Sequence, residues 1–169
     1  SMLASLVLGL ALNAARVLDP ATAYDPKIPT IKQVLGHDHG DEITSPEGVG
    51  TYLKALAAAA PERTRLVEYA RSWEGRPLWI FVVGSADRIA KLDTIKAGLK
   101  KLADPRTTTA VERDELIKTL PVSVWLLHGV HGNEISSSDA SLAEAYHLLA
   151  ARNDAGVDAI LANALVIID

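Results

Sequence analysis

Three dense runs of aliphatic and β-branched residues limit most strongly what this chain can fold into. They cover residues 78–83, 122–127 and 164–169, and runs of this kind are typical of buried strands. Segments with helical spacing of apolar residues lie around them, at 87–102, 109–120, 134–152 and 155–162. The pattern predicts an α/β fold with helices on both faces of a central sheet. A short turn at 73–77 suits an antiparallel pair, so we expect a mixed sheet.

Composition narrows the function classes. The chain has 169 residues, enough for one domain, with 49% hydrophobic residues and a net charge of −4. The mild acidic balance, without a basic block, argues against nucleic acid as a partner. The chain has no cysteine, which excludes disulfides and thiolate metal sites. Any bound metal must therefore use His, Asp, Glu or backbone oxygen.

The N-terminal 44 residues differ from the rest. Residues 1–18 carry an apolar run that is too short to span a bilayer. We interpret it as a signal-peptide remnant or a short apolar helix, and a remnant favours a secreted or periplasmic protein. Residues 19–44 are rich in Pro and Gly and predict an irregular arm lying over a domain. Ser45 and Pro46 then form a strong helix start.

The candidate site is the segment His128-Gly-Val-His131-Gly-Asn-Glu134, between a predicted strand and a predicted helix. In strand–turn–helix units this edge is where ligands usually bind. An imidazole and a carboxylate three residues apart can close on one zinc ion, which accepts nitrogen and oxygen donors. The alternative is a polar turn in which Glu134 is favoured by the helix N-terminus without a metal.

Other polar and aromatic residues have simpler interpretations. We expect His128 to be buried and hydrogen-bonded, Asp139 to be a solvated helix residue, and the serines at 136–138 to cap or pack the helix. His37, Asp38 and His39 are expected to lie in a solvated turn of the arm. We expect His147 to be either a surface residue or a hydrogen-bonded core residue. The tryptophans Trp73, Trp79 and Trp125 are expected in the core. In the helix predicted over 109–120, Val111, Leu116 and Ile117 are expected to form the inner face.

Two motifs in order make the pattern specific. Residues 131–134 (HGNE) follow a hydrophobic strand, and residues 72–78 (SWEGRPL) precede them by about fifty positions. Together they resemble the zinc carboxypeptidase family (carboxypeptidase A/B-like), and the arm resembles that of large secreted bacterial members. The resemblance spans residues 24–169. It implies that residues 45–169 form the N-terminal part of a carboxypeptidase-like catalytic domain, which is then an incomplete mixed α/β domain.

The resemblance also implies roles for individual residues. His131 and Glu134 would be two of three ligands of one Zn²⁺, and Asn133 stands where some members carry an arginine that contacts substrate. The third ligand and the catalytic general base are expected beyond residue 169, so no catalytic residue is assigned within the chain. The implied reaction is hydrolysis of C-terminal peptide bonds by metal-activated water. The expected partners are peptide or protein C-termini, including cell-wall peptides, and the chain alone is expected to be inactive.

Two other functions remain open at this point. The first is a zinc-dependent amidohydrolase or deacylase of the aspartoacylase kind, which shares the H-x-x-E motif. The second is a non-catalytic binding module that keeps the fold after losing its site. Residues that bind the substrate carboxylate would separate the first from a carboxypeptidase, and a missing third histidine or base glutamate would favour the second.

Overall fold

The computed structural model describes residue 18 and residues 21–169. Apart from Leu18, the apolar segment 1–18 lies outside the described residues, and so do residues 19–20. No helix within residue 18 and residues 21–169 has the length and apolar character needed to cross a membrane.

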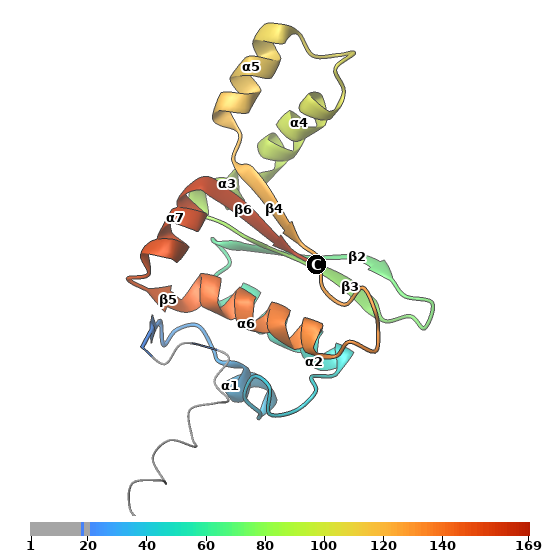
Figure 1. Cartoon of the computed structure of the whole chain (residues 1–169), viewed down its shortest axis with the longest axis vertical. Helices are drawn as coiled ribbons and strands as arrows, with labels where there is room; N and C mark the ends of the chain where they lie inside the picture. Colours follow the sequence, from blue (N-terminus) through green and yellow to red (C-terminus); the bar gives the residue numbers. More distant parts are fainter. Residues whose placement is uncertain (1–17, 19–20) are drawn as a thin grey trace, which may run out of the picture.

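A mixed four-stranded sheet forms the centre of the molecule, as the sequence predicts (Figure 1). Its strands are, in spatial order, β2 (Thr64–Arg71), β3 (Pro77–Val83), β6 (Ala164–Ile168) and β4 (Val122–Leu126). β3 runs antiparallel to both β2 and β6, whereas β4 and β6 are parallel. The β4–β6 pair therefore needs a crossover, which contains α6 (Ser136–Ala150) and α7 (Ala155–Asn163).

Helices cover both faces of this sheet, and the alternation of side chains in β3 and β6 explains why. Phe81 and Val166 belong to the main core cluster, together with buried residues of α2 (Pro46–Ala59), α6 and α7. Their neighbours Val82 and Leu165 point to the opposite face, where they pack with residues of α3 (Ala86–Ala90) and α4 (Leu92–Ala103). Successive residues of a strand face opposite sides, so two apolar strands support two layers of helix.

The helix predicted over residues 87–102 is instead two helices, α3 and α4. The break is at Lys91, whose backbone has φ −103° and ψ 14°. The Lys91 N–H donates to carbonyls of the preceding turn, at Asp87 and Arg88. Such a tightened last turn ends one helix and lets the next begin in a new direction. Apolar spacing alone does not detect this break, because both helices contribute to one buried cluster.

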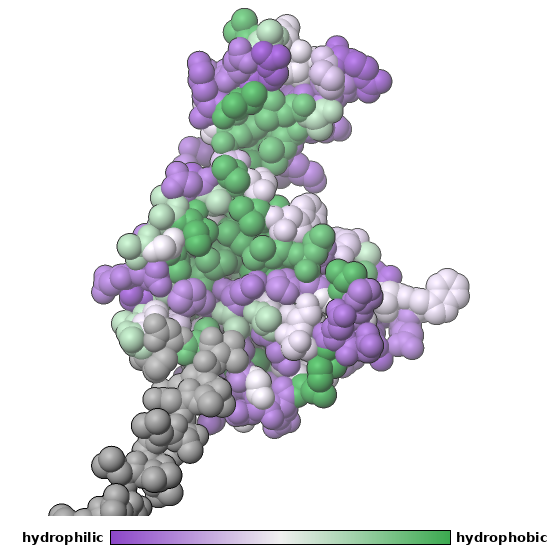
Figure 2. Space-filling view, in the orientation of Figure 1, coloured by the Kyte–Doolittle hydropathy of each residue, from purple (hydrophilic) through white to green (hydrophobic). Residues whose placement is uncertain are grey.

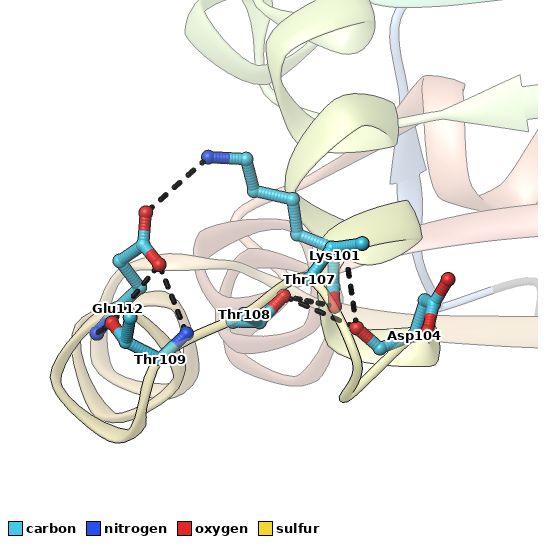
Figure 3. Close-up of polar contacts among 6 residues, drawn as sticks. All are labelled: Lys101, Asp104, Thr107, Thr108, Thr109 and Glu112. Atoms are coloured by element: carbon cyan, nitrogen blue, oxygen red, sulfur yellow. Dashed lines mark hydrogen bonds and ion pairs between the residues drawn. The ribbon is translucent and has the colours of Figure 1, made fainter.

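The helix α5 (Ala110–Thr119) begins at a complete capping box. Thr109 accepts the N–H of Glu112, and the Glu112 carboxylate accepts the N–H of Thr109 at 3.0 Å (Figure 3). The Glu112 carboxylate also lies 3.7 Å from Lys101 Nζ, and the Thr108 hydroxyl donates to the Lys101 carbonyl at 2.7 Å. These contacts fix α5 against the end of α4.

The expected inner face of α5 is wrong for two of its three residues, Val111 and Ile117, whereas Leu116 does face α4. Val111 and Ile117 are 80% and 63% exposed, because α4 and α5 extend together away from the sheet (Figure 1). α5 contacts α4, where the side chains of Leu116 and Leu120 lie over Gly98. One neighbouring helix covers one narrow stripe of α5 and leaves the rest in solvent.

β4 was expected to be a buried strand, and this is also wrong. Among the described strands it lies at the sheet edge and pairs with β6. Several of its apolar side chains are exposed, and Figure 2 shows an apolar area where β4 and β6 lie in Figure 1. Trp125 in β4 is half-exposed and Trp73 is fully exposed, so neither is a core residue as expected, whereas Trp79 packs against the main core cluster.

The arm contains more regular secondary structure than the sequence predicts. β1 (Ala23–Tyr24) pairs with β5 (Ala151–Arg152), and α1 (Ile31–Leu35) starts at a capping box formed by Thr30 and Gln33. Ile31 is completely buried in the main core cluster. The described part of the arm therefore packs against the main core and contains a short helix, while the predicted bounds of the arm, residues 19–44, stay a prediction.

Candidate metal centre

The turn over residues 127–135 joins the carboxyl end of β4 to α6. Its start is anchored to the end of the neighbouring strand: His128 N–H donates to the Asp169 carbonyl at 2.8 Å, and Asp169 N–H donates to the Leu126 carbonyl at 2.9 Å. The carboxyl ends of parallel strands form the edge where α/β folds usually bind ligands. The turn therefore lies where the sequence predicts it.

His131 and Glu134 converge within this turn. His131 Nδ1 lies 3.1 Å from Glu134 Oε1, and the two side chains are 66% and 61% exposed. The Glu134 N–H also donates to the His131 carbonyl at 3.1 Å, so the backbone between them forms a tight turn. A nitrogen and an oxygen donor this close together, open to solvent, are able to bind one metal ion.

Gly129 and Ser137 hold the shape of the turn. Gly129 has φ +69°, in the left-handed region that glycine adopts with little strain. Its N–H donates to the Ser137 hydroxyl at 3.0 Å, which ties the turn to the first residues of α6. The sequence predicted capping or packing for the serines, and it gave no signal for this particular partner.

His128 is separate from the donor pair. Its side chain is mostly buried, and Nε2 lies 3.0 Å from Glu144 Oε2 on α6. The expectation of a buried and hydrogen-bonded His128 is therefore confirmed. This contact occupies one ring nitrogen and fixes the ring toward α6.

The donor chemistry fits zinc, but the donor set is small. Zinc sites use imidazole nitrogen and carboxylate oxygen, and a catalytic site normally has three protein ligands. Within residue 18 and residues 21–169, no group of three or more His, Asp or Glu side chains is arranged to hold a metal ion. The turn thus offers two suitable donors, and Asn133 lies between them at the exposed surface.

A groove of about 470 Å³ borders this turn, and we call it the arm groove. Residues 39–43 of the arm form one side, and Ile135, Ser136, Asp139 and Ala140 form the other. Asp139 was expected to be solvated, but it is half-buried and accepts a hydrogen bond from the Thr44 hydroxyl. The expectation failed because the arm folds back over the first turn of α6.

His39 is also not in a solvated turn as expected. It is 9% exposed, and its ring lies 6.3 Å from the ring of Tyr52 and 6.5 Å from that of Tyr146. Gly36, with φ +92°, ends α1 and redirects the chain toward these rings. Burial holds the pKa of His39 below its usual value, since desolvation disfavours the charged imidazole.

Comparison with known proteins finds a matching family. The sequence profile of the zinc carboxypeptidase family matches residues 49–168, which is more than two-thirds of the chain. The match contains the sheet, the turn with its donor pair, and α6. A search of curated proteins finds no match.

Proposed function

Because the chain belongs to the zinc carboxypeptidase family, we propose that the protein is a metallocarboxypeptidase that hydrolyses C-terminal peptide bonds. In this proposal His131 and Glu134 are zinc ligands. The observation that supports it most directly is the 3.1 Å separation of His131 Nδ1 and Glu134 Oε1.

In this proposal the residues that carry and shape the donor pair have separate roles. An imidazole nitrogen of His131 and a carboxylate oxygen of Glu134 would hold the ion, and the Gly129–Ser137 hydrogen bond keeps the turn that carries them in place. When bound, zinc polarises the scissile carbonyl and lowers the pKa of a water molecule. The exposure of both ligands leaves one side of the turn open to a peptide.

The substrate assignment rests on the family and on position. We propose that the substrates are peptide or protein C-termini, including cell-wall peptides, and that the protein acts in a secreted or periplasmic location. Asn133 lies between the two ligands in the sequence and is proposed to contact the substrate. Among the described residues no third His, Asp or Glu joins the donor pair, so we propose that residues 1–169 alone bind zinc weakly and do not turn over substrate.

The test of the ligand assignment is the zinc content of the protein as the cell produces it, measured by mass spectrometry after dialysis. His131→Ala and Glu134→Ala should each weaken zinc retention more than about tenfold, since even residues that only orient a ligand contribute that much. Matched controls are His37→Ala and Glu62→Gln, which lie outside the turn and should retain wild-type zinc. Unchanged zinc content in the first two variants would refute the assignment.

A second measurement tests the reaction. Release of the C-terminal residue from a peptide, abolished by a chelator and restored by zinc, supports the proposed carboxypeptidase. Hydrolysis of an N-acyl amino acid without release of C-terminal residues would instead assign the protein to the deacylases. Zinc binding without either reaction would favour a binding module on the same fold.

A further inference from the structure

Residues 36–44 link α1 to α2 and form one wall of the arm groove, directly beside the turn that carries the donor pair. Two residues of this segment, His39 and Thr44, contact α2 and α6 through their side chains. His39 inserts between Tyr52 on α2 and Tyr146 on α6, and the Thr44 hydroxyl donates to Asp139 on α6. His39 is therefore the central anchor of the segment.

The site of His39 suits a neutral imidazole and not a charged one. The side chain is more than nine-tenths buried, and Nδ1 has no hydrogen-bond partner among the described residues. A protonated ring carries an N–H on both nitrogens, and the N–H on Nδ1 would be buried without a hydrogen-bond acceptor among the described residues. The neutral tautomer leaves Nδ1 as an unprotonated acceptor, which is the less costly form to bury.

The neighbouring charges do not cancel this cost. Asp38 and Asp139 favour the charged imidazole and His37 opposes it, but burial dominates and the pKa of His39 is lowered. The Asp38 carboxylate lies 3.6 Å from Lys32 Nζ, and the Asp139 carboxylate accepts the Thr44 hydroxyl. Burial raises the pKa of the two tyrosines that face His39, so both stay neutral at acidic and neutral pH.

We propose that His39 is a pH-sensitive latch: the neutral ring holds residues 36–44 against α2 and α6, and protonation releases them and opens the arm groove. The latch rests on the packing of His39 and is independent of the proposed zinc site. If the function proposed above is correct, the groove that opens borders the metal turn.

The direction of the pH effect follows from linkage. The released segment exposes His39, which then protonates near its ordinary pKa of about 6.5, whereas the docked ring protonates at a lower pH. The released state therefore binds more protons, and docking weakens as pH falls below about 6.5. The ratio of released to docked segment rises by up to about tenfold per pH unit, until the docked ring itself protonates.

The release is expected to stay local, because the other end of the arm has different anchors. β1 pairs with β5, and the Tyr24 hydroxyl lies 2.9 Å from His147 Nδ1. Asp25 and Arg152 form an ion pair at the same end. His147 Nε2 also lies 3.6 Å from the Asp154 carboxylate, which adds a contact at this end of the arm.

Amide hydrogen exchange of the full chain tests the latch between pH 7.5 and 5.5, with rates corrected for the intrinsic effect of pH. Wild-type protein should lose protection in residues 37–44 by up to about tenfold per unit below pH 6.5, while residues 23–25 stay protected. His39→Phe keeps an aromatic ring without a titrating group, and it should abolish this pH dependence. The matched variant His37→Phe should keep it.

Two results would overturn the proposal: a wild-type segment whose protection does not change with pH, or a dependence that persists in His39→Phe. If His39→Phe does not fold, an NMR titration of the histidine rings in wild-type protein decides the question. His39 protonating at lower pH than His37 supports the latch. A midpoint for His39 at or above that of His37 contradicts it.

Discussion

Gly129→Ala is the substitution that most directly probes the turn carrying the donor pair. Gly129 has φ +69°, and a Cβ added there would lie 3.7 Å from the Ser138 hydroxyl oxygen, an ordinary contact. A steric clash of the added Cβ with its neighbours is therefore not what destabilises this variant. The cost comes from the left-handed backbone, which places the Cβ of an L-residue too close to the adjacent carbonyl.

The magnitude follows from two opposing effects. A left-handed conformation costs a residue other than glycine roughly 1–2 kcal/mol. Alanine also restricts the unfolded chain, which returns roughly 0.4–1 kcal/mol. The free energy of unfolding should therefore fall by about 1 kcal/mol. Gly132→Ala is the matched control in the same turn, because Gly132 has no positive φ and an added Cβ meets nothing within 4 Å.

Urea denaturation followed by circular dichroism measures both variants. Gly129→Ala should lower the unfolding midpoint with an unchanged slope, and Gly132→Ala should leave it unchanged or raise it slightly. Equal effects of the two substitutions would refute the reasoning, since only the backbone conformation separates them. A loss well above about 2 kcal/mol for Gly129→Ala would mean that the turn also loses its bond to Ser137.

Other substitutions test the core and the helix pair. Phe81→Ala removes a fully buried ring from the main cluster and should lower the free energy of unfolding, measured in denaturant, by about 3–5 kcal/mol. Trp73→Ala, at a fully exposed position, should change this free energy by less than about 0.5 kcal/mol. Thr109→Ala removes the capping box of α5 and should lower the stability of this helix by about 1 kcal/mol. Amide exchange should then become faster in α5 and stay unchanged in α2. Equal acceleration in both helices would contradict a local role of the cap.

The fold class and most element boundaries are predictable from sequence because they depend on local patterns. Ser45 and Pro46 mark the start of α2 through their own backbone and side-chain preferences. The apolar alternation in β3 and β6 predicts two covered faces, and both are found. The turn at residues 73–77 is short enough to require an antiparallel pair.

Exposure is less predictable, because it depends on what lies beside an element. Val111 and Trp125 belong to segments with ordinary apolar content, yet both are largely exposed. α5 packs on a single helix and β4 lies at the edge of the described sheet. Neither fact is visible in local periodicity, so the sequence overestimates how much of each element is buried.

In the candidate site, too, contacts between residues close in sequence are predictable, whereas contacts between distant segments are not. His131 and Glu134 are three residues apart, so one tight turn brings their donor atoms within 3.1 Å, and the spacing was enough to predict this. Their role as zinc ligands stays a prediction. His39 meets Tyr52 and Tyr146 only because the arm folds back across α2 and α6, and a Pro/Gly-rich segment has no periodicity that predicts such a path. A histidine in an irregular segment is therefore poorly judged from its neighbours in sequence, since the fold decides whether its ring is solvated or buried.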